Sequence, residues 1–301
     1  MILPSPTAVA PGPEVAALEN PVVMRLVISC SDRPGIVAAV SGFLNESGAN
    51  IVRSDQYSSD PDAGTFFMRM EFAVPAECHP GLGERFGLAI AERFGMTWHL
   101  WDAAGPKRIA VMVSRYDHCL QELLWRWRRN ELGGEIVTVV SNHEDLRGAV
   151  ESFGLSYHYV PVEQGKKKDA EARDLELLGG ECDLVVLARY MQILSGDFLE
   201  RVGVPVINIH HSFLPAFAGA GPYERARERG VKLIGATAHY VTEQLDAGPI
   251  IEQDVVRVDH REDVVQLVER GAEVERSVLA RAVRWHCEDR VLEHAGTTVV
   301  F

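Results

Sequence analysis

From residue 107 onward, short apolar segments alternate with amphipathic segments, and this rhythm limits the possible folds more than any other feature. Residues 109–113 are apolar throughout, as expected for a strand that is buried on both faces. Strands of this kind that are joined by helices form a parallel sheet with helices on both sides. Such sheets bind ligands at the carboxyl ends of their strands. The pattern predicts a mostly parallel, doubly wound α/β domain over residues 107–301.

The hydrophobic periodicity also predicts the individual elements of this domain. Strands are expected at 109–113, 136–140, 157–160, 184–188, 206–210, 235–241 and 250–256. Helices are expected at 120–128, 144–153, 169–178, 222–229 and 264–286. The three lysines 166–168 are expected in a solvated loop before the third of these helices.

A different order of elements precedes this domain. Met24, Leu26 and Ile28 alternate with polar or smaller residues, as in a half-buried strand. The order βαββαβ over residues 21–103 predicts a ferredoxin-like domain, joined to the next domain by a linker at 103–106. Residues 1–20 contain four prolines and are expected to form a flexible tail. The remaining elements are expected as helices at 36–44 and 82–94 and as strands at 50–58, 65–74 and 97–101.

Charge and cysteine content exclude several classes of function. The 301 residues include 30 Lys and Arg against 43 Asp and Glu, so the net charge of −13 disfavours binding to nucleic acid. No apolar run is long enough for a membrane span. The five cysteines are scattered, which favours a reducing cytoplasm over a disulfide framework. HExxH and GxSxG motifs are absent, so we expect no metal and no serine nucleophile.

The densest group of reactive side chains is the segment NIHHSFLP, which begins at Asn208 where a buried strand is expected to end. In a strand, Asn208 and His210 point to the same side. An amide and an imidazole placed side by side can stabilise a carbonyl oxygen that gains negative charge. On spacing alone, a polar strand end with only a structural role is equally compatible with this segment. The neighbouring His211 either lines a pocket or stabilises the loop.

A second group of polar side chains follows the segment GATAHY. Asp246 comes just before Ala-Gly-Pro in the loop between two expected strands, where it can turn toward an imidazole. A carboxylate beside an imidazole can accept a proton from water. An Asx-type turn is the alternative interpretation of Asp246. His239 faces this group only if its strand has the correct register.

These two segments, NIHHSFLPAF and GATAHYVTEQLDAGPII, resemble the signature of the 10-formyltetrahydrofolate hydrolase/transferase family. The resemblance covers residues 107–301 and implies that Asn208, His210 and Asp246 are the catalytic residues. It implies a reaction on an N-formyl folate without a metal or a redox cofactor. The resemblance also implies a folate pocket formed by Arg189, Tyr190, Met191, Gln192, Ile193, Leu194 and His211, with Arg189 as a candidate for a basic rim.

Residues 22–102 resemble an ACT domain, a ferredoxin-like module that often binds amino acids at paired interfaces. The segment DRPGIV, which begins at Asp32, fits the first loop of that module. The resemblance implies a possible amino-acid effector site and a homo-oligomer. The effector residues implied in this way are Asp32, Pro34, Gly35, Ile36 and Asn50.

The acceptor of the formyl group is suggested by the loop after the first strand of the larger domain. Transferases of this family that use a ribonucleotide carry a glycine-rich phosphate loop there, but residues 114–120 contain no glycine, and Asp117 would repel a phosphate. Water remains as the acceptor, so the products would be formate and tetrahydrofolate for one-carbon and purine metabolism. Transfer to another amine and folate sensing without turnover are the alternatives. We also expect a larger polar residue where Gly221 stands.

Overall fold

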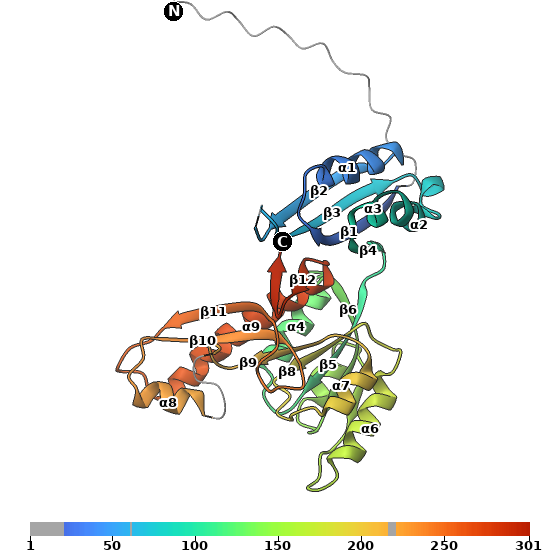
Figure 1. Ribbon diagram of the computed structural model, residues 1–301. Coiled ribbons are helices and arrows are strands. Elements are labelled where there is room, and N and C mark those ends of the chain that lie inside the picture. The colour runs from blue at the N-terminus through green and yellow to red at the C-terminus, as the bar shows by residue number, and fades with distance from the viewer. Residues whose placement is uncertain (1–20, 61, 216–220) are drawn as a thin grey trace, which may run out of the picture. The chain divides into compact units, whose positions relative to one another are not determined.

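The computed structural model describes residues 21–60, 62–215 and 221–301 (Figure 1). The tail 1–20, which was expected to be flexible, lies outside the described residues. The chain divides into two compact units, Met1–Ala104 and Gly105–Phe301. No helix in the described ranges has the length and apolar character that crossing a bilayer requires.

The first unit is a four-stranded antiparallel sheet with helices packed on its apolar side chains. The sheet order is β2-β3-β1-β4, and Leu26 of β1 pairs with Met70 of β3 and Leu100 of β4. Alternate residues of β1 and β3 form the core with α1, which confirms the ferredoxin-like prediction. Its strands are β1 (Val22–Ser31), β2 (Asn50–Ser58), β3 (Thr65–Val74) and β4 (Thr97–Asp102), and its longest helix is α1 (Ile36–Glu46).

The helix expected at 82–94 is divided in the structure. A π-helical turn, η2 (Gly87–Ala91), separates α2 (Leu82–Phe86) from α3 (Glu92–Phe94), and a 3-10 turn, η1 (Ala76–Cys78), precedes them. A Cβ on Gly87 would lie 3.3 Å from the Trp98 ring, so the helical backbone approaches β4 closely at this point. Phe86 and Ile90, on either side of the junction between α2 and η2, are both buried in the core.

The second unit is built on a seven-stranded sheet in the order β11-β10-β9-β8-β5-β6-β7. The five strands from β9 to β7 in that order are parallel, and β10 and β11 are antiparallel to their neighbours. The prediction of a mostly parallel α/β domain is therefore confirmed. The strands are β5 (Lys107–Val113), β6 (Gly134–Ser141), β7 (Tyr157–Tyr159), β8 (Leu184–Ala188), β9 (Val206–His210), β10 (Leu233–Tyr240) and β11 (Ile250–Arg257).

Two apolar cores cover the two faces of this sheet. Alternate residues of β5 separate onto them, since Val111 packs with α4 and α9 while Met112 packs with α6 and α7. In Figure 1, α6 and α7 lie together at the yellow-green end of the unit, away from the orange α9. The helices are α4 (His118–Arg128), α5 (Arg147–Glu151), α6 (Lys167–Leu178), α7 (Gly196–Val202), α8 (Pro222–Glu228) and α9 (Val264–Cys287).

Several elements of the second unit differ from the expectation. Lys167 and Lys168 lie in the first turn of α6 and not in a loop, and α5 is about half as long as the helix expected at 144–153. Helix α7 and the hairpin of β12 (Val291–His294) and β13 (Thr297–Val300) were not expected. Short strands of ordinary composition leave a weak periodic signal, because four residues contain only two alternations.

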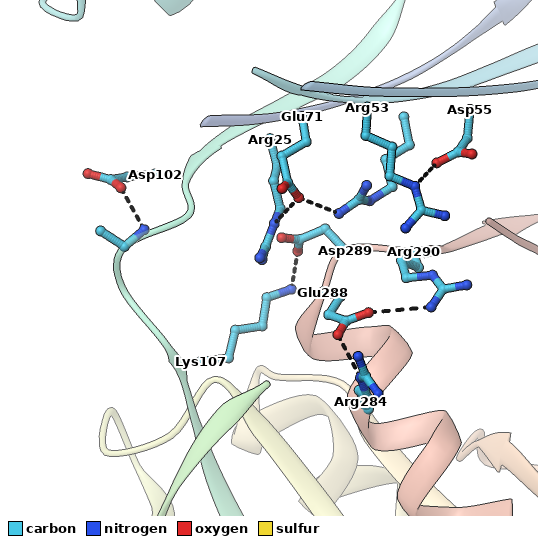
Figure 2. Close-up of polar contacts among 12 residues, drawn as sticks. Arg25, Arg53, Asp55, Glu71, Asp102, Lys107, Arg284, Glu288, Asp289 and Arg290 are labelled. Atoms are coloured by element: carbon cyan, nitrogen blue, oxygen red, sulfur yellow. Dashed lines mark hydrogen bonds and ion pairs between the residues drawn. The ribbon is translucent and has the colours of Figure 1, made fainter. Parts of the chain in front are cut away.

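Ion pairs fix the end of α9 and the hairpin that follows it. Figure 2 shows Glu288 between Arg284 and Arg290. The Glu288 carboxylate lies 2.7 Å from Arg284 Nε and 3.4 Å from Arg290 Nη1. Lys107 at the start of β5 is paired with Asp289 in the same view. These contacts hold the last turn of α9 to the first strand of its own unit. The first unit has its own pairing, in which Glu71 accepts from Arg25.

Candidate active site

Two neighbouring antiparallel strands, β9 and β10, bring three polar side chains together at one end of these strands. Asn208 of β9 pairs directly with His239 of β10, and His210 pairs with Thr237. Because side chains alternate along a strand, Asn208, His210 and His239 all face the same cavity. A register shift between Ala238 and His239 in the pairing with β11 helps to direct His239. The open question about the register of His239 is thus answered.

Asp246 approaches these side chains from the loop between β10 and β11. The loop folds tightly against β10, since a Cβ on Gly248 would lie 1.8 Å from the carbonyl oxygen of Tyr240. Asp246 itself has a φ of 55°, a left-handed conformation that aspartate adopts more readily than most residues. Its Oδ1 lies 3.3 Å from His210 Nδ1 and 3.9 Å from His239 Nε2. The three residues expected from the two motifs therefore come together.

The two ring nitrogens of His210 have different surroundings. Nδ1 faces the carboxylate of Asp246, whereas Nε2 is buried and has no hydrogen-bond partner among the described residues. Burial lowers the pKa of His210, while the charge of Asp246 opposes this effect and the neighbouring His239 adds to it. His210 is therefore neutral near pH 7, with its proton on Nδ1 and a free lone pair on Nε2.

His239 holds the amide of Asn208 in a defined orientation. His239 Nδ1 lies 2.9 Å from the carbonyl oxygen of Tyr240 and donates its proton there. Nε2 is then an acceptor, and the Nδ2 of Asn208 donates to it at 3.3 Å. Burial lowers the pKa of His239, which keeps this ring neutral. The second N–H of the Asn208 amide remains available to a ligand.

A cavity of about 240 Å³ opens over these groups. The six residues 189–194 after β8 line it, and two of them, Met191 and Ile193, are 51% and 60% exposed. Exposed apolar side chains at a cavity mouth offer a surface for a flat, apolar ligand. The expected folate-pocket residues that line this cavity are Arg189, Tyr190, Met191, Gln192, Ile193, Leu194 and His211.

Arg189 does not form an exposed basic rim, contrary to the expectation. It is 8% exposed, its Nε lies 3.4 Å from Glu275 Oε2, and its guanidinium stacks over Tyr116 at 4.8 Å from the ring centre. Glu275 also accepts hydrogen bonds from His118 Nε2 at 2.9 Å and from the Tyr223 hydroxyl at 2.7 Å. Sequence reasoning missed Glu275, because a single glutamate in a long amphipathic helix normally faces solvent.

The charge of Glu275 is strongly stabilised. Burial alone would raise its pKa, but the hydrogen bond from His118, the charge of Arg189 and the hydroxyl of Tyr223 together lower it to about 2. His211 lies near this group, and its ring centre is 5.2 Å from that of His210. Burial, followed by the charge of Arg189, lowers the pKa of His211 to about 4. His211 therefore lines the pocket as a neutral ring.

The described residues contain one group with the ligand types of a metal site, formed by His118, Cys119 and Glu275. Burial raises the pKa of Cys119 well above its usual value, so its sulfur stays protonated near pH 7. The positive charge of Arg189 lies beside Glu275 and would repel a cation. This group does not fit a resident metal ion.

The loop after β5 lacks the features of a phosphate site. Asp117 is the N-cap residue of α4, and although its side chain makes no capping hydrogen bond, a carboxylate there would repel a phosphate at the helix N-terminus. Gly221, the departure noted in the sequence, is the N-cap of α8 and has a φ of 63°. A larger residue there would adopt a left-handed backbone, and its Cβ would lie 3.3 Å from Glu224 Oε2. This conformation is a physical reason for glycine at 221.

Among the candidate effector residues of the first unit, Ile36 has a buried side chain. It is 2% exposed and belongs to the apolar core, so only the backbone of Ile36 is placed to contact a ligand. Pro34 and Gly35 lie at the exposed turn before α1, and Asn50 is exposed at the start of β2. Asp32 accepts a hydrogen bond from the Ser58 hydroxyl.

Comparisons with known proteins agree with this architecture. Residues 107–283 match the formyl transferase family model, and residues 24–75 match the ACT domain model. The chain is 58% identical over 279 residues to a formyltetrahydrofolate deformylase of Mycobacterium bovis, which covers 92% of this chain and 90% of the relative.

Solved structures resemble this chain over different shares of its length. A crystal structure of a formyltetrahydrofolate deformylase from Pseudomonas syringae is similar over 93% of this chain and 94% of that chain, with a TM-score of 0.87 and 51% identity. A glycinamide ribonucleotide transformylase from Symbiobacterium toebii covers 65% of this chain and 94% of that chain, with a TM-score of 0.61 and 30% identity. Likeness over both units distinguishes the first of these proteins from the second. The chain belongs to the formyltetrahydrofolate deformylase family.

Proposed function

We propose that this protein is a hydrolase that converts 10-formyltetrahydrofolate to formate and tetrahydrofolate. The observation that carries the proposal is the environment of His210, whose Nδ1 faces Asp246 while its buried Nε2 has no partner in the described chain. A neutral imidazole in this arrangement can take a proton at Nε2, and the carboxylate stabilises the ring once it is charged.

In the proposed reaction, Asp246 and His210 act as a pair on a water molecule. The oxygen of this water bonds to the formyl carbon, and its proton passes to the pair. The formyl oxygen becomes negative and accepts hydrogen bonds from the free N–H of Asn208 and from the charged His210 ring. The bond from carbon to N10 then breaks, and N10 takes the proton. Removing one oxyanion donor typically slows such a reaction by about 10²–10³.

Folate binding is assigned to the cavity beside the catalytic residues. The exposed side chains of Met191 and Ile193 would pack on the flat pterin, and backbone groups of residues 190–194 would bond to its edge. Asp117 at the start of α4 argues against a ribonucleotide acceptor, because its charge would repel the phosphate. Water is then the acceptor of the formyl group.

The first unit is proposed as a regulatory and pairing module. An ACT domain is compatible with an amino-acid effector near Asp32, Pro34, Gly35 and Asn50, and with a homo-oligomer. The five cysteines are free, which suits a reducing cytoplasm. Formate and tetrahydrofolate released there would supply one-carbon and purine metabolism.

The proposal is tested by measuring formate release from 10-formyltetrahydrofolate without any amine. We expect release by the wild type, and a decrease of at least about a hundredfold in kcat for Asp246→Asn. Asp145→Asn, which removes the same charge at an exposed position of the same unit, should match the wild type. Turnover only in the presence of an amine would indicate a transferase, and folate binding without turnover would indicate a sensor.

A further inference from the structure

A second cavity of about 250 Å³ lies next to the catalytic cavity and has no role in the reaction described above. Three residues, Arg189, Met191 and His211, line both cavities and so stand between them. Tyr116 and Glu275 line only the second cavity. A small product that forms at His210 is therefore next to a second cavity in the same unit.

Arg189 is built into the wall of this second cavity. It follows β8 with a φ of 61°, a conformation that arginine rarely adopts, and it is 8% exposed. Residues held in this region of backbone space often belong to functional sites. Its Nε and Nη1 are buried without a hydrogen-bond partner in the described ranges. A buried guanidinium normally satisfies its donors, so these two atoms call for an acceptor.

Glu275 does not supply that acceptor. Its carboxylate already receives close hydrogen bonds from His118 at 2.9 Å and from Tyr223 at 2.7 Å. Arg189 Nε lies 3.4 Å away, which is an ion pair without the alignment of a hydrogen bond. The guanidinium is thus held in place by Glu275 and by the ring of Tyr116, while Nε and Nη1 lack a hydrogen-bond partner in the described ranges. A fixed guanidinium with free donors is suited to a planar carboxylate.

We propose that the second cavity is a formate site, in which the Arg189 guanidinium holds the product anion before its release. This inference rests on the proposed hydrolysis, which forms formic acid when the bond to N10 breaks. The acid loses its proton to the basic groups of the site or to water and becomes an anion. It then moves past His211 to Arg189, while tetrahydrofolate still occupies the first cavity.

The other groups that line the second cavity fit this assignment. His211 is neutral near pH 7 and can donate one N–H to a carboxylate oxygen. Glu224 also lines the cavity, but it is exposed to solvent. Formate, a carboxylate with one carbon, is smaller than this cavity of about 250 Å³, and the folate product is assigned to the first cavity. The two products can therefore be bound at the same time.

The first experiment measures binding of ¹³C-formate to the wild-type protein by NMR, without and with saturating tetrahydrofolate. We expect saturable binding that persists when tetrahydrofolate is present. Competition between the two products would assign formate to the catalytic cavity and overturn the inference. Chloride at the same ionic strength should not displace formate. If chloride displaces formate as well as unlabelled formate does, the site binds any small anion and the assignment to formate is overturned.

The second experiment compares Arg189→Gln with Arg115→Gln. Both changes remove one positive charge, but Arg115 is exposed and lines neither cavity. We expect formate binding to weaken at least about tenfold in Arg189→Gln only, as for the loss of a charge-assisted hydrogen bond. Equal binding by both variants would overturn the inference. If Arg189→Gln does not fold, the tetrahydrofolate test on the wild type still decides.

These experiments separate the site from the proposed function, because neither of them needs turnover. Hydrolysis without formate binding would refute the formate site and leave the hydrolase intact. Formate binding that depends on Arg189, together with no hydrolysis, would refute the hydrolase and the product role of the site.

Discussion

Replacing Glu275 by glutamine should destabilise the second unit in a way that depends on pH. The side chain is 2% exposed and its carboxylate contacts His118, Arg189 and Tyr223. The gap between its usual pKa of 4.5 and its value of about 2 corresponds to about 3 kcal/mol of stability at pH 7. Glutamine keeps the shape and one acceptor but loses the charge that faces Arg189.

The sign of this pH dependence follows from the number of protons that Glu275 binds in the folded and the unfolded state. Between pH 4.5 and 2 the folded protein binds fewer protons at Glu275 than the unfolded chain does, so the contribution is complete above pH 4.5 and is lost as the pH falls. We expect Glu275→Gln to lower the free energy of unfolding by about 3 kcal/mol at pH 7 and by about 1 kcal/mol at pH 3.

Urea denaturation at both pH values measures this difference. Glu273→Gln is the matched control, because Glu273 lies on the same helix α9 and is exposed. Its free energy of unfolding should stay within about 0.5 kcal/mol of the wild type. A loss for Glu275→Gln that is the same at pH 7 and pH 3 would refute the electrostatic reasoning and indicate a packing effect.

Three further predictions concern other parts of the second unit. Burial and then the charge of Glu171 raise the pKa of Asp174 to about 7, so Asp174→Asn should be more stable than the wild type in urea at pH 8, by up to about 4 kcal/mol, with the gain lost near pH 4. Gly271→Ala would put a Cβ 1.8 Å from the Tyr223 hydroxyl, and the strain should lower the free energy of unfolding by about 2 kcal/mol, measured by thermal denaturation. Burial lowers the pKa of His210, so kcat/KM for formate release should fall only below pH 6.5, and a midpoint above that pH would contradict a neutral His210.

Local patterns in the sequence were sufficient to predict the sheet and to place Asn208 and His210 side by side, whereas their catalytic role is implied by the family resemblance and remains a proposal. Asn208 and His210 lie two residues apart at a strand end, and this spacing alone places them on one side of β9. His239 could not be assigned in this way, since its direction depends on pairing with β9 and on a local register shift. Such information belongs to contacts between segments that lie about thirty residues apart.

Arg189 and Glu275 show a different limit of sequence reasoning. Both residue types are normally exposed, so the resemblance to a folate enzyme suggested a basic rim at Arg189, and no pattern in the sequence singled out Glu275. They are buried because each satisfies the charge of the other at the end of β8 and the middle of α9, which are 86 positions apart in the chain. A signal for this pair would be a glutamate on the apolar stripe of the helix, since Val274 and Val278 are buried beside it.

Two pairs of interacting side chains lie near the end of β9, and they have different roles. His210 is close to Asp246, and this pair can gain and lose a proton because burial keeps the imidazole neutral at rest. Glu275 stays charged near neutral pH and holds the guanidinium of Arg189 in place, and this guanidinium can bind an anion. Neutral His211 lies between them and adds no charge to either side. Because proton transfer and anion binding need opposite electrostatic properties, they are better served by two adjacent cavities than by one.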